Sequence, residues 1–500
     1  MEIEGKREHS YNHILKYTSI FGGVQGLNIL IGLVRNKIVA KLLGPVGMGL
    51  ASLFNSTVNF ISQATNFGIS FSAVRHVSEL FDEGDEARIA HFVKVVRGWS
   101  LLTGLLGMLL CILLGSTLSN LTFRWGDHTL HFMLLAPAVA MLAITGGETA
   151  ILKGARRLRS LAFIQLINVF VSVLISLPLY YSFGQRGIVP VIVLMAFASM
   201  VLTIWHSYRL YPLRMKGSSG ILGEGMEMVR LGVAFMLAGI LGSGAEMFIR
   251  TWLNINGDLN VVGLYNAGFM LTMTYGGMVF SAMETDYFPR LSAVNTDVLQ
   301  SNLIVNRQIE VSVLVIGPML VALFFATPIL VPLLLTDEFL PVVNMMRFTT
   351  LALYLRAMKL PVCYMTLAKG DGYSYLLMEG IYDIAMVVLV LLGYSFFGLS
   401  GTGLALLAVA LLDYIIINTY TYFKYHYRPS LETLCLGGIH SLIGLVSFVL
   451  VYAVHGWLYW FMGVVMLALS LSFSFWVLHQ KTSLMNKLKS NFKNRFIGHA

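Results

Sequence analysis

The sequence predicts an all-α polytopic membrane protein with about 14 transmembrane helices, arranged as two six-helix lobes plus two C-terminal helices around a central cavity. Of the 500 residues, 57% are hydrophobic and only 12% are charged, whereas soluble domains carry roughly 25% charged residues. Apolar blocks of roughly 20 residues, the length that crosses the hydrocarbon core as a helix, recur along the chain. Segments of the first half also return in the second half, which indicates an internal duplication.

The apolar blocks and the charged breaks between them place the individual spans. If the N-terminus is cytoplasmic, most of the 34 Lys and Arg residues fall in loops on the cytoplasmic side, as the positive-inside rule requires. We therefore expect both termini in the cytoplasm. The expected spans are 17–40, 48–74, 98–120, 130–152, 161–183, 187–208, 230–253, 261–283, 309–335, 345–368, 373–397, 400–423, 433–454 and 457–479.

The internal repeat appears as four short matches in the same order, at an offset of 214 to 216 residues. They place Gly49-Leu50 over Gly263-Leu264, Arg75 over Arg290, Lys153-Gly154 over Lys369-Gly370, and Gly184 and Gly187 over Gly398 and Gly401. Six helices are an even number, so both lobes enter from the same side, as in transporters with parallel repeats. We expect an N-terminal lobe over 1–227, a second lobe over 228–424, two additional helices over 425–479 and a basic cytoplasmic tail over 480–500.

Several function classes are disfavoured. Cys111, Cys363 and Cys435 lie singly within apolar segments, without the spacing of a disulfide framework or a metal site. The net charge of +9 comes from short loops between spans and predicts topology rather than nucleic-acid binding. The longest polar interval is 75–97, too short for a catalytic domain, and no catalytic motif is present. We expect no enzyme activity, no catalytic residue, no metal and no cofactor.

Charged residues within spans are costly and usually face a cavity or a partner. Basic side chains fall in the outer parts of the first and seventh spans and near the middle of the tenth. We expect them to line a basic, substrate-binding cavity, although those near the outer interface could instead extend to water. The basic residues are Arg35, Lys37, Arg250, Arg356 and Lys359, with Arg250 assigned as the repeat equivalent of Arg35.

Acidic residues within spans leave more than one interpretation open. Glu246 lies four residues before Arg250, which is the spacing of an ion pair on one helix. Glu379 and Asp383 share a helix face, and Asp413 lies alone in the twelfth span. These carboxylates could bind a coupling proton or sodium ion, or could balance the charge of the basic residues.

The second span carries an unusual number of polar side chains. They recur every three or four residues and therefore form one face of a helix. We predict that this face lines the cavity between the lobes, with hydrogen bonding between helices as the alternative. The polar face comprises Ser52, Asn55, Ser56, Asn59, Ser62, Gln63 and Asn66.

The same region resembles a known family. The residues that carry the resemblance are Gly44, Pro45, Gly47, Gly49, Gly68 and Arg75, with "LKGARRLRS" at 152–160. The chain is similar to the polysaccharide-transport proteins, the Wzx-type flippases of the multidrug/oligosaccharidyl-lipid/polysaccharide exporter superfamily. This resemblance implies transfer of an undecaprenyl-diphosphate-linked oligosaccharide, such as an O-antigen repeat unit, to the outer leaflet of a bacterial inner membrane by alternating access. A basic cavity suits the diphosphate, because Arg offers planar paired donors to phosphate.

The resemblance also implies the partners, namely the undecaprenyl-diphosphate-linked glycan, membrane lipid and other polysaccharide-assembly membrane proteins. We expect a monomer that binds no nucleic acid. The two extra helices resemble those of lipid II flippases, so that function is an alternative. A cation-coupled multidrug exporter would require an aromatic and acidic cavity, and a membrane glycosyltransferase or polymerase would require an acidic metal site or a large outer loop.

Overall fold

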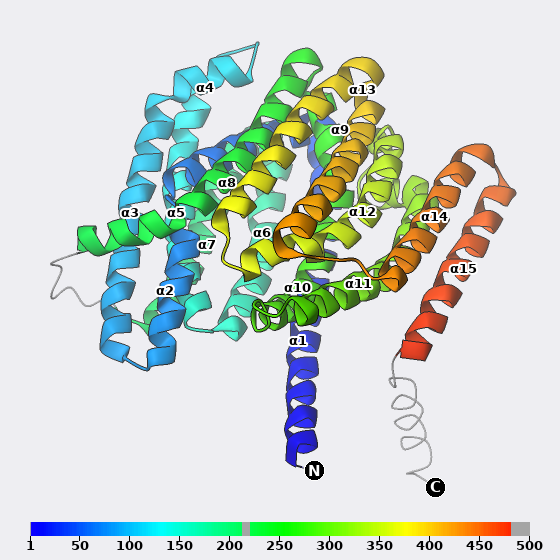
Figure 1. Cartoon of the computed structure of the whole chain (residues 1–500). Helices are drawn as coiled ribbons and strands as arrows, with labels where there is room; N and C mark the ends of the chain where they lie inside the picture. The colour runs from blue at the N-terminus through cyan, green and yellow to red at the C-terminus, as the bar shows by residue number, and fades with distance from the viewer. Residues whose placement is uncertain (1, 213–220, 482–500) are drawn as a thin grey trace, which may run out of the picture. The chain divides into compact units, whose positions relative to one another are not determined.

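The computed structural model describes residues 2–212 and 221–481. Within these residues every regular element is a helix, so the all-α prediction is confirmed for the described chain (Figure 1). The elements up to residue 212 are α1 (Glu2–Thr65), α2 (Ile69–Glu83), α3 (Glu86–Leu113), α4 (Gly115–Thr122), α5 (Thr129–Gly154), α6 (Leu158–Phe183), η1 (Gly184–Gly187) and α7 (Ile188–Leu210).

The second part of the described chain begins at residue 221. The predicted basic tail falls almost wholly on residues 482–500, which lie outside the described residues. The elements of this part are α8 (Ile221–Asn256), α9 (Leu259–Phe269), the π-helical turn η2 (Met270–Thr274), α10 (Tyr275–Ser292), α11 (Val298–Leu334), η3 (Asp337–Phe339), α12 (Val342–Ala368), α13 (Gly372–Tyr425), α14 (Leu431–Ala453) and α15 (Trp457–Lys481).

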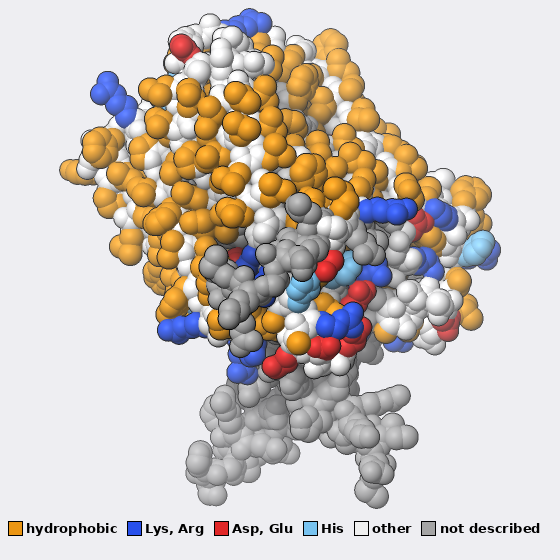
Figure 2. Space-filling view, turned by 90° about the vertical axis from the view of Figure 1, so that its left-hand side faces the viewer, with side chains coloured by type: hydrophobic (Ala, Val, Ile, Leu, Met, Phe, Trp, Pro, Cys, Tyr) orange, Lys and Arg blue, Asp and Glu red, His pale blue; other side chains and the backbone are white. Residues whose placement is uncertain are grey.

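Helices long and apolar enough to cross a membrane dominate the structure. Ten such segments occur among the described residues. Arg159–Leu210 and Gly372–Tyr425 each contain two predicted spans, and Gly26–Thr65 covers parts of the first two. Large apolar side chains are widely exposed, as a surface solvated by lipid requires. Figure 2 shows such side chains covering one face, with charged and histidine side chains gathered toward its lower end.

Glycines with positive φ separate helices that otherwise run on. Gly44 has φ of 62° and divides α1 between the first two predicted spans. The predicted span 48–74 is wrong in one respect, because α1 ends at Thr65 and α2 begins at Ile69 after left-handed Phe67 and Gly68. Gly68 lies so close to the backbone of Gly232 that a Cβ would overlap the Gly232 carbonyl, which explains the break at this point.

The backbone repeats with a constant spacing of 214 residues. Helix α5 ends at Gly154 and α12 at Ala368, and α6 begins at Leu158 and α13 at Gly372. The matched glycines Gly184 and Gly398 have φ of 55° and 58°, a left-handed conformation that favours glycine. The helix ends correct one sequence match, since Lys369-Gly370 aligns with residues 155–156 rather than with Lys153-Gly154.

Repeat-equivalent residues meet where α1 packs against α9. A Cβ on Gly49 would overlap the Leu259 carbonyl, and a Cβ on Gly263 would overlap the Pro45 carbonyl. Ser52 Oγ donates a hydrogen bond to Asn266 Oδ1 at 3.0 Å, and these two residues are also 214 apart. Such reciprocal contacts between equivalent positions are typical of a two-fold relationship. The similarity of the segments near 49 and 263 thus corresponds to a direct contact.

The described chain forms two compact units. Unit 1 comprises Met1–Leu271, Val331–Val342 and Gly370–Ala405, and unit 2 comprises Thr272–Leu330, Val343–Lys369 and Leu406–Ala500. These limits differ from the predicted lobe boundaries at 227 and 424, and the lobes and the cavity between them stay predictions.

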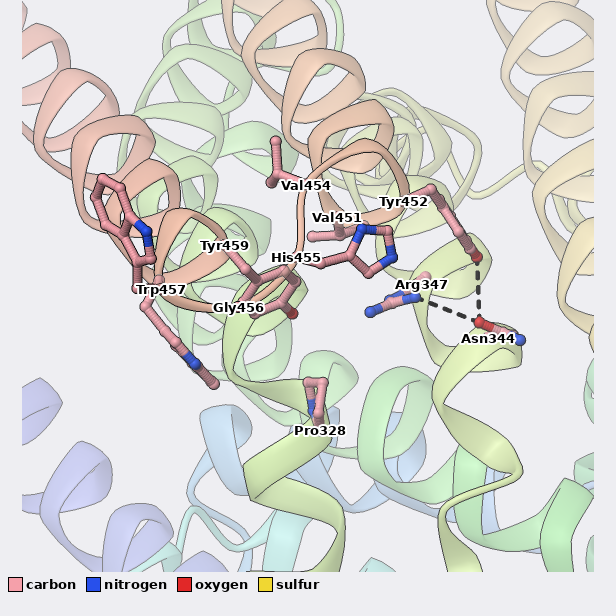
Figure 3. A pocket seen from close by; sticks show the side chains of 11 residues that line it. Pro328, Asn344, Arg347, Val451, Tyr452, Val454, His455, Gly456, Trp457 and Tyr459 are labelled. Atoms are coloured by element: carbon pink, nitrogen blue, oxygen red, sulfur yellow. Dashed lines mark hydrogen bonds between the residues drawn. The ribbon is translucent and has the colours of Figure 1, made fainter.

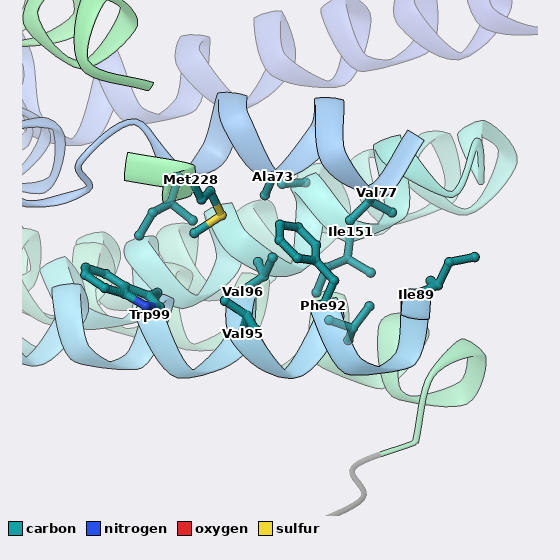
Figure 4. Close-up of a cluster of buried hydrophobic side chains, with 12 residues drawn as sticks. Ala73, Val77, Ile89, Phe92, Val95, Val96, Trp99, Ile151 and Met228 are labelled. Carbon is teal, nitrogen blue, oxygen red and sulfur yellow. The ribbon is translucent and has the colours of Figure 1, made fainter. Parts of the chain in front are cut away.

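Each unit contains a cluster of buried apolar side chains. In unit 1, residues of α2, α3 and α5 pack together with Met228 from the start of α8 (Figure 4). In unit 2, Leu314, Leu436 and Val477 connect α11, α14 and α15. The two C-terminal helices are therefore packed through their apolar side chains into unit 2.

Candidate functional site

A polar pocket of about 390 Å³ lies within unit 1, among α1, α5, α6 and α7. Its apolar lining comes mainly from α5 and α7. Amide, hydroxyl and guanidinium groups enter it from α1, α6 and α7, and no carboxylate is among the side chains that line it. The polar residues are Arg35, Asn55, Asn59, Asn168, Ser172, Tyr180 and Ser199.

Arg35 contacts two neutral side chains at the pocket. Its Nε donates to Ser176 Oγ at 3.2 Å, and one terminal nitrogen lies 3.7 Å from Met195 Sδ. Ser176 in turn donates to the carbonyl of Ser172 one turn earlier on α6. These contacts fix the guanidinium in a pocket whose other polar groups are uncharged. The pocket can therefore accept an anionic group together with hydroxyl groups.

The predicted polar face of α1 is divided by its surroundings. Asn55 and Asn59 line the pocket, whereas Ser52 makes the interhelical bond to Asn266. Ser56 is buried and donates to the carbonyl of Leu53 within the same helix. The interhelical hydrogen bond at Ser52 matches the alternative interpretation, whereas Asn55 and Asn59 line a pocket within unit 1, and the predicted lining of a cavity between the lobes stays a prediction.

The remaining residues of this face lie toward its end. Asn66 Nδ2 donates a hydrogen bond to Ser70 Oγ at 2.7 Å. Gln63 is exposed, and its amide nitrogen is 3.3 Å from the position that a Cβ on Gly239 would take. Ser62 is partly buried.

Two further predicted basic residues in unit 1 lie apart from the lining of this pocket. Lys37 Nζ donates to the carbonyl of Pro332, and Arg250 Nη1 contacts Glu246 Oε2 at 2.9 Å. The assignment of Arg250 as the repeat equivalent of Arg35 is wrong, because the 214-residue spacing places Ile249 there. A shift of one residue turns a side chain by about 100° around the helix, so Arg250 is on a different face.

In unit 2, the two basic residues of α12 have different neighbours. Lys359 Nζ lies 2.7 Å from Asp413 Oδ2 on α13, and the two side chains are only 13% and 10% exposed. Arg356 instead directs Nη1 toward Met273 Sδ at 3.8 Å. Arg35 and Arg250 belong to unit 1, so a cavity shared by all the basic residues stays a prediction.

The predicted acidic pair on α13 lies in unit 1. Asp383 is 5% exposed, and a Cβ on Gly242 of α8 would lie 3.5 Å from its carboxylate. Glu379, one turn earlier, is partly buried. Among the described residues, no group of three or more His, Cys, Asp or Glu side chains is arranged to hold a metal. Ion coupling through Asp383, Glu379 or Asp413 stays a prediction.

The sequence interpretation missed the contribution of α6 to the pocket. Asn168, Ser172 and Ser176 follow one another at intervals of four residues and form a polar stripe. Asn168 Nδ2 donates to Ser199 Oγ on α7 at 3.2 Å, which connects the two helices at the pocket. The same periodicity that identified the polar face of α1 is thus present on α6.

A buried ion pair of unit 1 lies outside the lining of this pocket. Arg97 Nε lies 2.9 Å from Glu148 Oε1, with side chains 9% and 3% exposed. Its Nη1 also donates to the Tyr211 carbonyl, and its guanidinium lies 3.9 Å from the centre of the Tyr208 ring. This cluster connects α3, α5 and α7 and is a structural feature of unit 1.

Comparison with known proteins identifies the family. Residues 38–344 match the family described as "polysaccharide biosynthesis protein", which is more than half of the chain. The chain belongs to this family. The match begins close to Arg35 and covers the polar faces of α1 and α6, so most of the pocket lies within the family region. No curated protein sequence matches the chain.

Solved structures show the fold of this polysaccharide biosynthesis family member. An inward-facing multidrug resistance MATE family transporter of the MOP superfamily is 14% identical, with a TM-score of 0.67 over 81% of this chain and 98% of the other. The lipid II flippase MurJ in an inward closed conformation is 14% identical, with a TM-score of 0.66 over 92% and 99%.

A third structure is a MOP superfamily transporter from Pyrococcus furiosus, described by a reverse polarity of its binding pocket. It is 15% identical, with a TM-score of 0.58 over 81% of this chain and 94% of the other. Together these similarities confirm the predicted polytopic membrane fold.

Proposed function

We propose that this protein is a flippase, and not an enzyme, that moves an undecaprenyl-diphosphate-linked oligosaccharide from the inner to the outer leaflet by alternating access. The family and the transporter fold support a flippase-type transporter. The pocket around Arg35 is the observation that carries the substrate assignment. We place the protein in a bacterial inner membrane, as a monomer with both termini cytoplasmic, working beside other polysaccharide-assembly membrane proteins.

The pocket combines the two kinds of donor that this substrate needs. A diphosphate or an acidic sugar is an anion, and a guanidinium such as that of Arg35 can donate two parallel hydrogen bonds to it. Sugar hydroxyls both donate and accept, and the side-chain amides of Asn55, Asn59 and Asn168 do the same. A volume of about 390 Å³ is within the range of small-molecule pockets. The pocket therefore suits one part of a glycan rather than the long lipid tail.

One alternative has an observation in its favour. The structural match to the lipid II flippase MurJ covers 92% of this chain, whereas the match to the MATE transporter covers 81%. Lipid II also joins a diphosphate to sugars, so the same pocket chemistry applies. A multidrug exporter of organic cations fits less well, because the charged residue in the lining is Arg35 rather than a carboxylate.

The test is deletion of the gene, followed by chemical identification of the undecaprenyl-linked intermediate that accumulates on the inner leaflet. We expect an oligosaccharide repeat unit, and re-expression of the wild-type chain clears it. Arg35→Gln should fail to clear it, whereas Arg186→Gln, which removes an exposed arginine of η1, should succeed. Accumulation of lipid II would favour the alternative, and sensitivity to toxic cations without any lipid intermediate would contradict both.

A further inference from the structure

A second and larger pocket, of about 700 Å³, lies in unit 2 at the turn between α14 and α15 (Figure 3). It is lined by Asn344 and Arg347 from α12, by Tyr452 from α14, and by residues of the turn and the start of α15 that include His455, Trp457 and Trp460. None of these residues lines the Arg35 pocket. The turn belongs to the pair of C-terminal helices beyond the predicted duplication, so this pocket is a feature of that addition.

Arg347 is the charged group of the pocket. Its guanidinium lies 4.8 Å from the centre of the Tyr452 ring, a cation–π distance. Its Nη1 is 3.4 Å from Asn344 Oδ1, and the same oxygen accepts from Tyr452 at 3.4 Å. Arg347 Nε is buried and has no hydrogen-bond partner among the described residues. A buried donor without a partner costs free energy, and an anionic ligand would supply the acceptor.

The aromatic side chains of this pocket differ in exposure. Tyr459 is 9% exposed, and its hydroxyl donates to the Phe325 carbonyl at 2.9 Å. Trp457 and Trp460 are 76% and 43% exposed. An aromatic belt at the membrane interface would explain exposed tryptophans. It would not explain a cavity that is lined both by these tryptophans and by Arg347, whose Nε has no hydrogen-bond partner among the described residues.

We propose that this pocket binds an acidic sugar unit, a pyranose ring that carries a carboxylate. The carboxylate would pair with Arg347, since a guanidinium matches a planar carboxylate. The C–H groups of the ring would stack on the electron-rich faces of the tryptophans, and Asn344 and His455 would contact the hydroxyls.

The biological role of this site rests on the proposed function. In the predicted orientation the turn at 454–456 is on the outer side of the membrane, where a flippase releases its glycan. The pocket would then hold the released glycan next to the protein after transfer. Binding of a soluble acidic sugar does not require transport, so the two proposals can be tested separately.

The test uses the purified full chain in nanodiscs of zwitterionic lipid, titrated with digalacturonate and followed by calorimetry. We expect saturable binding that is about tenfold or more weaker in Arg347→Gln, because a charge-assisted contact is lost. Trp457→Leu should weaken binding to a similar extent. Arg124→Gln and Trp476→Leu, which remove exposed side chains outside the pocket, should bind as the wild type does.

Three results would overturn the proposal. The first is unchanged affinity for digalacturonate in a folded Arg347→Gln variant, and the second is equal affinity for the neutral digalactoside. The third is displacement of digalacturonate by glycerol phosphate at equal concentration, which would indicate a site for lipid headgroups instead. If Arg347→Gln does not fold, Arg347→Lys replaces it, and full affinity there would contradict paired recognition of the carboxylate. If digalacturonate does not bind but the lipid intermediate is cleared normally, only the sugar site is contradicted. If digalacturonate binds but no lipid intermediate depends on the protein, only the flippase proposal is contradicted.

Discussion

Arg35 in unit 1 and Lys359 in unit 2 are alike in sequence but differ in their surroundings. Each is a basic residue within a long apolar stretch, and each side chain is partly buried. Arg35 lies at a pocket among amide and hydroxyl groups and donates to Ser176. Lys359 lies against the carboxylate of Asp413 at 2.7 Å. The same sequence feature thus leads to an open polar pocket in one unit and a closed ion pair in the other.

The difference concerns the groups that surround each charge. A charge in an apolar region must be solvated by water, by dipoles or by an opposite charge. At Lys359 the carboxylate performs this role, so an incoming anion would have to compete with Asp413. At Arg35 the lining of the pocket is uncharged, and an anion can add to it. This contrast supports the proposal that Arg35 contacts the substrate and that the Lys359–Asp413 pair is structural.

The largest expected effect comes from breaking the Lys359–Asp413 pair. Asp413→Asn removes the carboxylate that lies 2.7 Å from the buried Lys359 ammonium, and we expect a loss of about 3–5 kcal/mol in stability. Thermal unfolding in detergent measures this loss. The double variant Lys359→Met with Asp413→Leu should recover most of it, because neither charge is then buried. Unchanged melting of Asp413→Asn would contradict the structural role of the pair.

A smaller effect on stability but a large effect on transport is expected at Arg35. Arg35→Gln should lower the rate at which the lipid-linked intermediate is flipped by about 10- to 100-fold, as one charge-assisted contact of 1.5–3 kcal/mol is lost. Its melting temperature should stay close to that of the wild type. Arg35→Lys should fall between the two, since lysine keeps the charge but not the planar paired donors. A melting change as large as that of Asp413→Asn would remove the contrast between the two residues.

The polar face of α1 offers a matched pair of positions for a finer test. Asn59→Ala should lower transport about three- to tenfold, because one neutral hydrogen bond is worth roughly 0.5–1.5 kcal/mol. Ser56→Ala, on the same face but buried and bonded within its own helix, should leave transport unchanged. The measurement is clearance of the lipid intermediate after normalisation to the amount of folded protein. Equal effects at both positions would show that the pocket is not what distinguishes them.

The smallest effect is expected at His128, in the turn before α5. Within the described chain, this ionisable side chain is neither paired with a carboxylate, as Lys359 is, nor placed at the polar pocket, as Arg35 is. Burial, and secondly the nearby His131, lower the pKa of His128 below its usual value. The unfolded chain therefore takes up a proton first, and stability is full above about pH 6.5 and falls as the pH drops through the folded pKa. We expect a change of under about 1 kcal/mol, measured by melting between pH 7.5 and 5. His128→Gln should flatten this dependence, and an unchanged slope would contradict it.

Periodicity and glycine placement predicted much of the fold. The turns at Gly184 and Gly398 were predictable because glycine recurs at both matched positions, and the structure shows a left-handed backbone at each. Asn55 and Asn59 were predictable as members of one polar helix face because they recur at helical spacing, and both line the pocket of unit 1. The choice of Asp413 as the neighbour of Lys359 was not predictable, because it depends on how α12 packs against a helix more than 50 residues away.

The errors have a common physical origin. An error of one residue is enough to move a side chain to another face of a helix. The repeat offset that placed Arg250 at the position of Arg35 was one residue too long. The break at Phe67 and Gly68 depends on the approach of Gly232 from α8, a contact that local sequence does not contain. Sequence periodicity therefore identified polar faces well, while contacts between distant segments decided which side chains on each face line a pocket.

The crossing of α1 and α9 at Gly49 and Gly263 has an implication for the ancestry of the chain. Contacts between equivalent positions are what a dimer of two identical half-length chains would make across its symmetry axis. In such a dimer a substitution at the crossing appears in both chains at once. A side chain in place of the glycine would therefore overlap the backbone of the other chain at two places. After fusion into one gene the two sides could evolve separately. Ser52 and Asn266 have done so and now form an asymmetric donor–acceptor pair, whereas the two glycines have remained identical.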